Sequence, residues 1–363
     1  MIAIQNVYYM LAYAFQTLNE QGYQNVATEQ FNNVADLCAA ILIRGVPVQI
    51  KRGLARDYIP RSDSISVIRG KINITESIKT QSLLRKQMVC LFDEFSLNTQ
   101  MNRILKTTMG KLLHADVDKT RKKELKRLMV YFSEVEEIDA NSINWKIQFG
   151  RQNQGYRMLI AVCFLVLKGL LQTTSNGSTR LMDFVDEQNM YRLYEKFLLE
   201  YYRREYPAIK AESSQIKWAL DNDNGAMLPI MKSDITLSCG NKVLIIDAKY
   251  YSHTTQARFE KNTIHSSNLY QIFTYVKNKE AGFQDSSHEV SGMLLYAKTD
   301  DAIQPENTYQ MSGNRISVKT LDLAGSFDEI EYQLYRIAKE HFGDKAGVPV
   351  SSRNKAIEVG NHS

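Results

Sequence analysis

Hydrophobic residues recur every three to four positions in the first half of the chain, a period that predicts amphipathic helices. One helix starts at Asn6, a candidate N-cap, and a second covers residues 30–43 and ends before Gly45. Helices are also expected within residues 76–135 and over 155–172. The last of these holds a run of ten apolar residues without a charge. Such a short run is typical of a buried helix and not of a membrane span.

Two segments between these helices alternate apolar and polar residues, which predicts β-strands. The first covers residues 46–60 and begins Val-Pro-Val-Gln-Ile, and the second covers residues 65–75. Basic residues occur in both segments: Lys51, Arg52, Arg56, Arg69 and Lys71. Charges on an exposed edge strand protect it against aggregation, and the alternative, contact of these residues with a partner protein, is implied by the family resemblance given below.

The pattern changes in the second half, where short apolar runs alternate with amphipathic segments. A helix over residues 187–206 ends at Pro207. It is followed by strands at 216–220, 228–237 and 242–250, a helix at 266–279, strands at 292–296, 308–311 and 317–321, and a helix at 327–341. This order predicts an α/β domain with a mixed sheet flanked by helices.

The domain organisation follows from these patterns. Polar, turn-forming residues at 173–178 interrupt the helical pattern and favour a boundary close to them. We therefore expect an α+β N-terminal domain over 1–180, an α/β domain over 181–346, and a polar, disordered tail over 347–363. The length of 363 residues agrees with two domains.

Composition narrows the class of protein. Hydrophobic residues make up 44% and charged residues 23%, as in folded soluble proteins. The four cysteines are not spaced as metal ligands, and no basic leader precedes the first helix, so a cytoplasmic protein is expected. The net charge of +5 argues only weakly for a polyanionic partner. The basic run 119–127 is read as a solvated helix face, with a phosphate-contact surface as the alternative.

Several catalytic motifs are absent from the sequence. It contains no GxxxxGK[ST] phosphate loop, no GxGxxG, no HExxH and no GxSxG. The chain therefore does not hydrolyse nucleotides by a phosphate-loop mechanism. If its function requires a nucleotide-driven motor, that motor must be another chain.

The most informative stretch is 227–251, in which two apolar segments flank the turn-rich Ser-Cys-Gly-Asn and predict a β-hairpin. Asp247 and Lys249 are two residues apart in the second strand and hence on one face of the sheet. Asp234 begins the first strand, and pairing would bring it to the same end. Carboxylate oxygens are the ligands that Mg²⁺ prefers, and a bound metal with a lysine beside it suits hydrolysis of a phosphodiester.

Two helices contribute further candidates. Gln271 and Tyr275 are four residues apart, so they share a helix face that can meet the sheet end, although a core position is the alternative for Tyr275. Glu195 and Glu200 lie in the helix before the sheet, and the family resemblance given below implies that Glu195, with Glu200 as its rival, is a third metal ligand. For Glu195, a solvated helix position is the alternative.

Asp234, Asp247-Ala248-Lys249 and Gln271-x-x-x-Tyr275 resemble the PD-(D/E)xK nuclease pattern in its RecB-like version. The glycine often found before the first Asp is replaced by Met231-Lys232-Ser233, which leaves the metal chemistry intact. The segments NVYYMLAYAF (6–15), RGLARDY (52–58) and VIRGKI (67–72), followed by the hairpin, are similar to the McrC family over residues 4–342.

That resemblance implies the nuclease subunit of an McrBC-type, modification-dependent restriction system. Such a subunit cuts double-stranded, cytosine-modified DNA with Mg²⁺ when it is assembled with an McrB-type AAA+ GTPase hexamer. Its N-terminal part docks on the motor and stimulates the GTPase, and two assemblies can meet through a second McrC copy. The alternatives are a non-catalytic adaptor of an AAA+ ring and a stand-alone repair nuclease. The intact Asp, Asp and Lys set favours the nuclease subunit over the adaptor.

Overall fold

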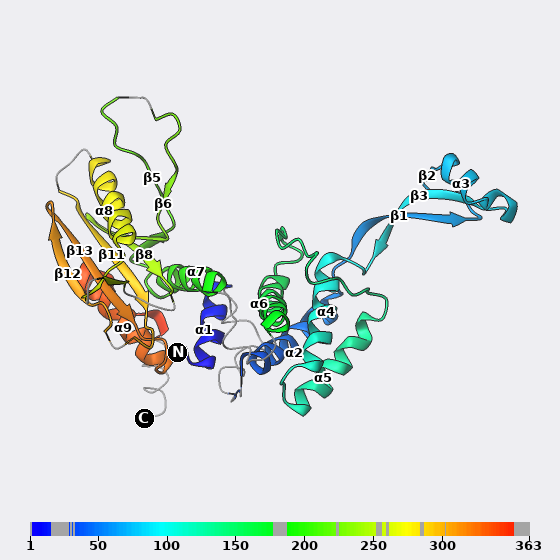
Figure 1. Cartoon of the computed structure of the whole chain (residues 1–363), viewed down its shortest axis with the longest axis horizontal. Coiled ribbons are helices and arrows are strands. Elements are labelled where there is room, and N and C mark those ends of the chain that lie inside the picture. Colours follow the sequence, from blue (N-terminus) through cyan, green and yellow to red (C-terminus); the bar gives the residue numbers. More distant parts are fainter. Residues whose placement is uncertain are drawn as a thin grey trace. The chain divides into compact units, whose positions relative to one another are not determined.

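The computed structural model describes residues 2–15, 29, 31, 33–176, 187–222, 225–251, 256–258, 261–283, 287–301 and 303–351. The chain divides into two compact units (Figure 1). The C-terminal unit combines residues 1–20 with 185–363, and the helical unit comprises residues 21–184. This division differs from the expected boundaries, because the first twenty residues belong with the C-terminal unit.

Helix α1 (Ile4–Ala14) shows why the N-terminus joins the C-terminal unit. The sequence suggested Asn6 as the N-cap of this helix, but Ala3 holds that position. Asn6 is instead 2% exposed, and its Nδ2 donates hydrogen bonds to the carbonyl oxygens of Leu323 and Gly325, each at 2.8 Å. Satisfying a buried amide in this way fixes α1 against residues more than 300 positions away in sequence.

The C-terminal unit is built on a six-stranded sheet with the order β12-β13-β11-β8-β7-β4. The strands are β4 (Lys210–Glu212), β7 (Ile235–Cys239), β8 (Lys242–Lys249), β11 (Glu289–Ala297), β12 (Asn307–Met311) and β13 (Asn314–Leu321). Strand β11 is parallel to β8 and β13, and the other pairs are antiparallel. The mixed sheet and the β7–β8 hairpin, which turns at Gly240 with a φ of 60°, are therefore confirmed.

Helices cover both faces of this sheet. Helix α8 (Ser266–Ala281) packs on one face, where Ile272 meets Ile245 and Leu294 in an apolar cluster. Helices α7 (Glu187–Glu205) and α9 (Phe327–Phe342) also contact β8 but contribute nothing to that cluster, so they cover the opposite face. Two short strand pairs flank the sheet: β5 (Gln215–Ile216) with β6 (Met231–Lys232), and β9 (Gln256–Arg258) with β10 (Lys261–Thr263).

The C-terminal unit ends in a short 3₁₀ turn and the few described residues after it. A 3₁₀ turn, η5 (Gly343–Ala346), follows α9. Of the expected disordered tail, residues 347–351 are described, and the backbone N–H of Ser351 donates to Glu205 Oε2 at 2.7 Å. Residues 352–363 lie outside the described residues, and so do residues 177–186, which contain the expected domain boundary.

The helical unit packs α2 (Val34–Arg52), α4 (Gln100–His114), α5 (Lys119–Met129) and α6 (Tyr156–Asn176) together, with a 3₁₀ turn, η3 (Val130–Phe132), after α5. The buried helix expected over 155–172 is thus confirmed. Part of the basic run in α5 is structural, because Arg121 forms ion pairs with Glu29 at 2.9 Å and with the buried Asp36 at 2.5 Å. A charge paired in this way serves the fold and is not free for a phosphate.

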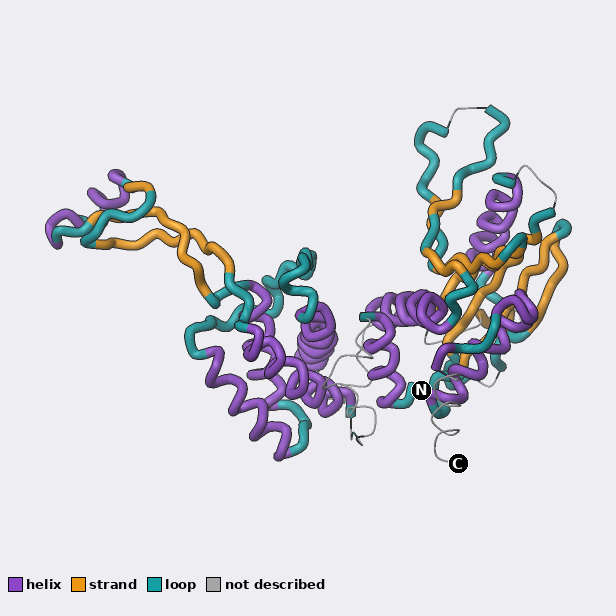
Figure 2. The backbone as a smooth tube through the Cα atoms, turned by 180° about the vertical axis from the view of Figure 1, so that it is seen from behind, coloured by secondary structure: helices purple, strands orange, loops and turns teal. Residues whose placement is uncertain are grey.

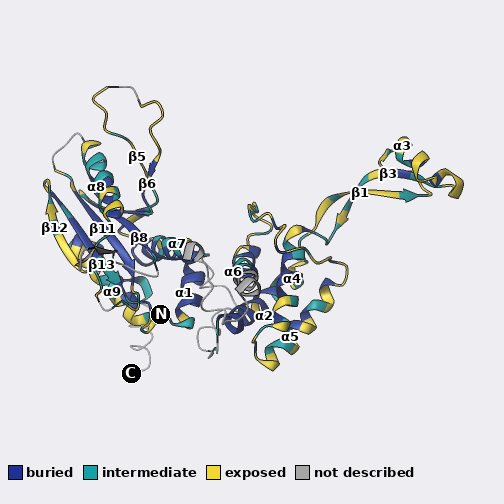
Figure 3. Cartoon of the chain, viewed as in Figure 1, coloured by how far each residue is buried: buried dark blue, intermediate teal, exposed yellow. Residues whose placement is uncertain are grey.

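A long β-hairpin projects from the helices of this unit (Figure 2). We call residues 57–96 the arm: β1 (Asp57–Ile65) pairs with β3 (Met88–Ser96), and β2 (Lys71–Ile72), α3 (Ile74–Lys79) and η2 (Ser82–Arg85) form its tip. Most of its residues are exposed (Figure 3). Its exposed apolar side chains are Tyr58, Val67, Ile68, Ile74, Ile78, Leu83, Leu84, Leu91 and Phe95. So many exposed apolar side chains on one element are unusual for the surface of a folded protein.

Three expectations for the helical unit were wrong: the end of a helix before Gly45, a strand that begins at residue 46, and helices throughout 76–135. Residues 46–52 belong to helix α2, which passes through Gly45 and Pro47 and ends at Gly53, whose φ is 86°. Val46 is completely buried, so tertiary packing outweighs the hydrogen bond that Pro47 cannot donate. Within 76–135, expected to be helical, β3 forms because each of its residues pairs with β1.

Helix α8 approaches the sheet closely at Gly292. A Cβ atom at Gly292 of β11 would lie 2.8 Å from side-chain carbons of both Ile272 and Val276 on α8. Gly292→Ala therefore pushes α8 from the sheet and is expected to cost about 1–3 kcal/mol of unfolding free energy. This loss is measured by urea unfolding, followed through the fluorescence of Trp218, which packs on the same cluster. Trp145 is replaced by Phe in all variants so that only Trp218 reports.

The matched control is Gly282→Ala at the end of α8. There the φ is −75° and the nearest atom lies 3.4 Å from the new Cβ, an ordinary contact. Equal stabilities of the two variants would show that α8 does not rest on Gly292.

Candidate functional site

The pairing of β7 with β8 places two aspartates opposite one another. Ile235 faces Ile246 in the register, so Asp234, one position earlier, lies opposite Asp247. Asp234 immediately precedes β7, and its Oδ2 accepts a hydrogen bond from the backbone N–H of Ala248 at 2.9 Å. The hairpin therefore brings the two carboxylates to one end of the sheet, as the sequence predicted.

The side chains of Asp247 and Lys249 occupy the sheet face that α8 covers. Asp247 is 1% exposed, and its Oδ2 lies 2.7 Å from Lys249 Nζ. Lys249 also donates to Gln271 Oε1 at 3.2 Å, and Gln271 Nε2 donates to the Tyr275 hydroxyl at 2.9 Å. The prediction that Gln271 and Tyr275 face the sheet end is confirmed, and a continuous polar chain now links β8 to α8.

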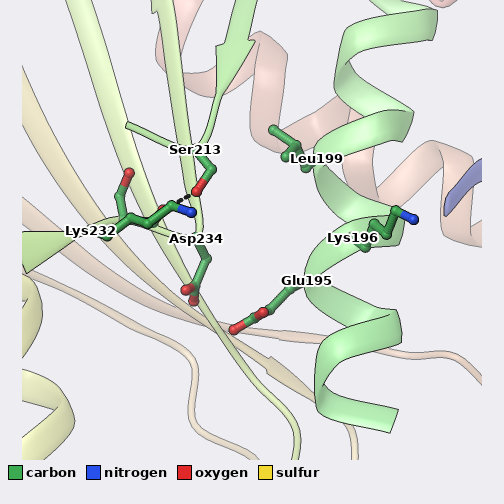
Figure 4. Close-up of a pocket in the computed structure, with 7 residues that line it drawn as sticks. Glu195, Lys196, Leu199, Ser213, Lys232 and Asp234 are labelled. Carbon is green, nitrogen blue, oxygen red and sulfur yellow. Dashed lines mark hydrogen bonds between the residues drawn. The ribbon is translucent and has the colours of Figure 1, made fainter. Parts of the chain in front are cut away.

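Helix α7, which covers the sheet face opposite α8, brings another carboxylate towards Asp234. Glu195 points towards Asp234 across a pocket of about 250 Å³ that both residues line (Figure 4). Its rival Glu200 instead pairs with Arg203 at 2.7 Å. The structure thus brings Glu195 to the aspartates and leaves Glu200 in a local ion pair.

Tyr191 is a residue of this site that the sequence reasoning missed. It lies one turn before Glu195 on α7, and its hydroxyl hydrogen bonds to the Glu195 carboxylate. Burial, the charge of Asp234 and that hydrogen bond together raise the pKa of Tyr191 well above its ordinary value. The spacing of four residues from Glu195 was the only signal in the sequence, and it has no meaning until Glu195 is placed.

The electrostatics of the site are those of crowded, buried acids. Burial, and then the charges of Asp247 and Glu195, raise the pKa of Asp234 from 3.8 to about 9. Burial also raises the pKa of Asp247, against the opposing effect of Lys249. Burial alone would lower the pKa of Lys249, but the neighbouring Asp247 charge raises it. Lys249 is therefore held as a cation between carboxylates.

These residues fit a hard divalent cation. No hydrogen-bond donor among the described residues reaches the buried Asp247 Oδ1, and carboxylate oxygens are the ligands that Mg²⁺ prefers. Asp234 and Asp247 would hold the ion. In the described part of the chain, no three His, Cys, Asp or Glu side chains are close enough together to bind a metal, so Glu195 as third ligand stays a prediction.

The basic residues expected on strands in the first half are found elsewhere. Lys51 and Arg52 end helix α2 and are exposed, so their assignment to a strand was wrong. In or beside the arm, Arg56 and Arg69 lie over the rings of Phe95 and Phe92, and Lys71 is on β2. Their role in partner binding remains a prediction.

Comparisons with known proteins identify related chains. The model of a family described as McrBC 5-methylcytosine restriction system component matches residues 4–297. A curated relative, the type IV methyl-directed restriction enzyme EcoKMcrBC of Escherichia coli strain K12, is 30% identical over 346 residues, which are 94% of this chain and 98% of the relative. In the part of the chain that the structure describes, no helix is long and apolar enough to cross a membrane.

Two solved structures also align with the chain. One is a half-complex of Thermococcus gammatolerans McrB AAA+ hexamers with bound McrC, with a TM-score of 0.49 and 16% identity over 92% of this chain and 75% of that chain. The other is the cryo-EM structure of the Thermococcus gammatolerans McrBC complex, with a TM-score of 0.36 and 16% identity over 47% of this chain and 55% of that chain.

The raised pKa of Asp234 predicts how stability depends on pH without metal. The folded chain holds this proton more tightly than the unfolded chain, so stability falls as the pH rises from about 4 towards 9. Asp234→Asn removes this dependence. Its unfolding free energy, relative to that of the parent chain, is expected to increase steadily from pH 5 to pH 9 in urea titrations with EDTA.

Asp221→Asn, which changes an exposed aspartate of the same unit, is the matched control. A stability difference for Asp234→Asn that does not change with pH would contradict the assignment of Asp234 as a half-buried, repelled carboxyl.

Proposed function

The chain belongs to the McrBC 5-methylcytosine restriction system component family, and we propose that it is the Mg²⁺-dependent endonuclease subunit of such a system. The substrate class is double-stranded DNA that contains modified cytosine. The observation that carries the proposal is the convergence of Asp234, Asp247 and Lys249 at the end of the β7–β8 hairpin. A chain that had kept only an assembly role would have no reason to retain this costly group.

The residues of the site have separable roles in this proposal. The Ala248 N–H fixes the Asp234 carboxylate, while Asp247 is fixed by Lys249, so both present oxygen atoms in set positions. The chemistry that Mg²⁺ held by Asp234 and Asp247 would supply is stabilisation of negative charge on the scissile phosphate and activation of a water molecule. Gln271 holds Lys249 from α8, so that its ammonium is directed towards the attacking water or the phosphate.

We assign the contact with an AAA+ GTPase ring to the arm. A hairpin that exposes many apolar side chains and has little core of its own needs a partner to bury them. The structures that align with this chain include McrC bound to McrB AAA+ hexamers. In this chain the arm then supplies the docking contact that stimulates GTP hydrolysis, and its exposed Arg56, Arg69 and Lys71 flank that contact.

The central test of the proposal is Asp247→Asn. The substitution keeps the side-chain shape but removes a negative metal ligand, so cleavage is expected to fall by on the order of a hundredfold or more. The measurement is single-turnover cleavage of a 5-methylcytosine duplex with Mg²⁺, GTP and the partner GTPase. Stimulation of the GTPase is expected to stay at the parent level.

The two readouts separate the candidate functions. Cleavage by Asp247→Asn at the rate of the exposed control Asp221→Asn would contradict the nuclease assignment. A parent chain that stimulates the GTPase but never cuts DNA would instead identify a non-catalytic adaptor. Cutting without any partner would identify a stand-alone nuclease.

The docking role of the arm is tested by a substitution at its tip. Leu84 is 81% exposed, and Leu84→Asp places a charge where an apolar contact is proposed. The apparent affinity of the chain for the GTPase ring is expected to fall roughly tenfold or more, as for a central interface residue. Titration of GTPase stimulation against chain concentration measures it.

Val130→Asp is the control, because Val130 is 71% exposed on η3 of the same unit but lies outside the arm. If Val130→Asp weakens stimulation as much as Leu84→Asp, docking does not depend on the arm.

A further inference from the structure

The pocket beside Asp234 extends beyond the residues used above. Helix α7 forms one wall, and the other is formed by the segment that leads into β7 (Figure 4). The lining residues are Glu195, Lys196, Leu199, Ser213, Lys232, Ser233 and Asp234. The acidic end of the pocket therefore belongs to the proposed metal site, while the end with Lys232 has no role in it.

Lys232 is a cation that is available to a ligand in this pocket. Its side chain is exposed, and no acidic side chain in the described part of the chain lies within ion-pair distance of it. Lys196 differs, because it points away from Asp234 in Figure 4 and its Nζ lies 3.8 Å from the centre of the Phe15 ring. An anion that enters the pocket thus meets Lys232.

A network of hydroxyl groups holds the backbone between Lys232 and Asp234. Ser213 Oγ donates to the carbonyl oxygen of Ser233 at 2.7 Å, and the Ser233 N–H donates to the carbonyl oxygen of Ser214 at 3.0 Å. Ser233 Oγ also lies 2.8 Å from Thr236 Oγ1. Ser233 is 1% exposed, and Ser213 and Ser214 are half-buried, so these hydrogen bonds hold the backbone that forms the floor of the pocket.

The spacing matches the repeat of a nucleic-acid strand. Two residues of chain span at most roughly 7 Å, so the Lys232 side chain starts within that distance of Asp234. One strand of DNA carries a phosphate about every 3.4 Å of helix axis. A phosphate near Lys232 is therefore one or two nucleotides from a phosphate held at Asp234 and Asp247.

We propose that this pocket is a subsite for a non-scissile phosphate of the DNA strand being cut, and that Lys232 binds it. This inference rests on the proposed function and adds a substrate-positioning residue to it. Contacts to phosphate fix the position of a strand without reading its sequence. Lys232 then sets which phosphodiester lies over the aspartates, regardless of the modified base.

The test compares Lys232→Ala with Lys217→Ala in the full chain. Lys217 is an exposed lysine next to β5, the strand that pairs with β6, but it does not line the pocket. Binding of a short labelled duplex is measured by fluorescence anisotropy with Ca²⁺ in place of Mg²⁺, across a salt titration. Each duplex is also made with one neutral methylphosphonate at successive positions around the cut.

Lys232→Ala is expected to weaken binding on the order of fivefold and to reduce the salt slope by about 0.9, the value for one lost phosphate contact. Lys217→Ala is expected to match the parent chain. A methylphosphonate one or two nucleotides from the cut is expected to weaken DNA binding by the parent chain by the same factor. It is expected to leave DNA binding by Lys232→Ala unchanged.

Equal binding by the two lysine variants, or additive losses at every methylphosphonate position, would overturn the subsite. The proposed function is tested separately by cleavage of the 5-methylcytosine duplex without any methylphosphonate, in the presence of Mg²⁺, GTP and the partner. A parent chain that binds but does not cut contradicts the nuclease proposal, while the comparison of Lys232 with Lys217 still decides the subsite.

Discussion

The site depends on the pairing register of β7 with β8, because that register sets Asp234 against Asp247. A slip by one residue would turn the side chains of a strand to the other face of the sheet and separate the two carboxylates. The two-residue turn at 240–241 sets this register, because Cys239 pairs directly with Lys242, and burial of Ile245 and Ile246 holds the paired strands in the core. The hydrophobic core thus stabilises an arrangement of like charges that would otherwise repel one another.

The helices complete what the hairpin begins. Helix α8 holds Lys249 through Gln271, and α7 brings Glu195 with its partner Tyr191 towards Asp234. Helix α8 can reach the sheet only because Gly292 lacks a side chain. The position of Lys249 therefore depends both on its hydrogen bond to Gln271 and on the close packing of α8 against Gly292.

The sequence predicted most of the C-terminal unit but much less of the helical unit. In the hairpin, alternation, a turn and two aspartates all pointed to one structure, so local pattern and tertiary contact agreed. In residues 46–52 they disagreed: Val and Ile at alternate positions favoured a strand, yet burial of Val46 made the segment helical. Tyr191 and Lys232 carry no motif of their own, and they acquire meaning only from Glu195 and Asp234 in space.

The distribution of charge bears on how such a site would act. Around the aspartates, the pocket offers a duplex one unpaired lysine, Lys232, among its described lining residues. A single phosphate contact contributes little affinity at physiological salt, because binding to DNA grows with the number of counterions released. The arm, in contrast, concentrates apolar surface that suits a protein partner. A nuclease built in this way positions a strand well but captures it poorly. It therefore fits the proposed function, in which this chain cuts DNA only together with a GTPase partner.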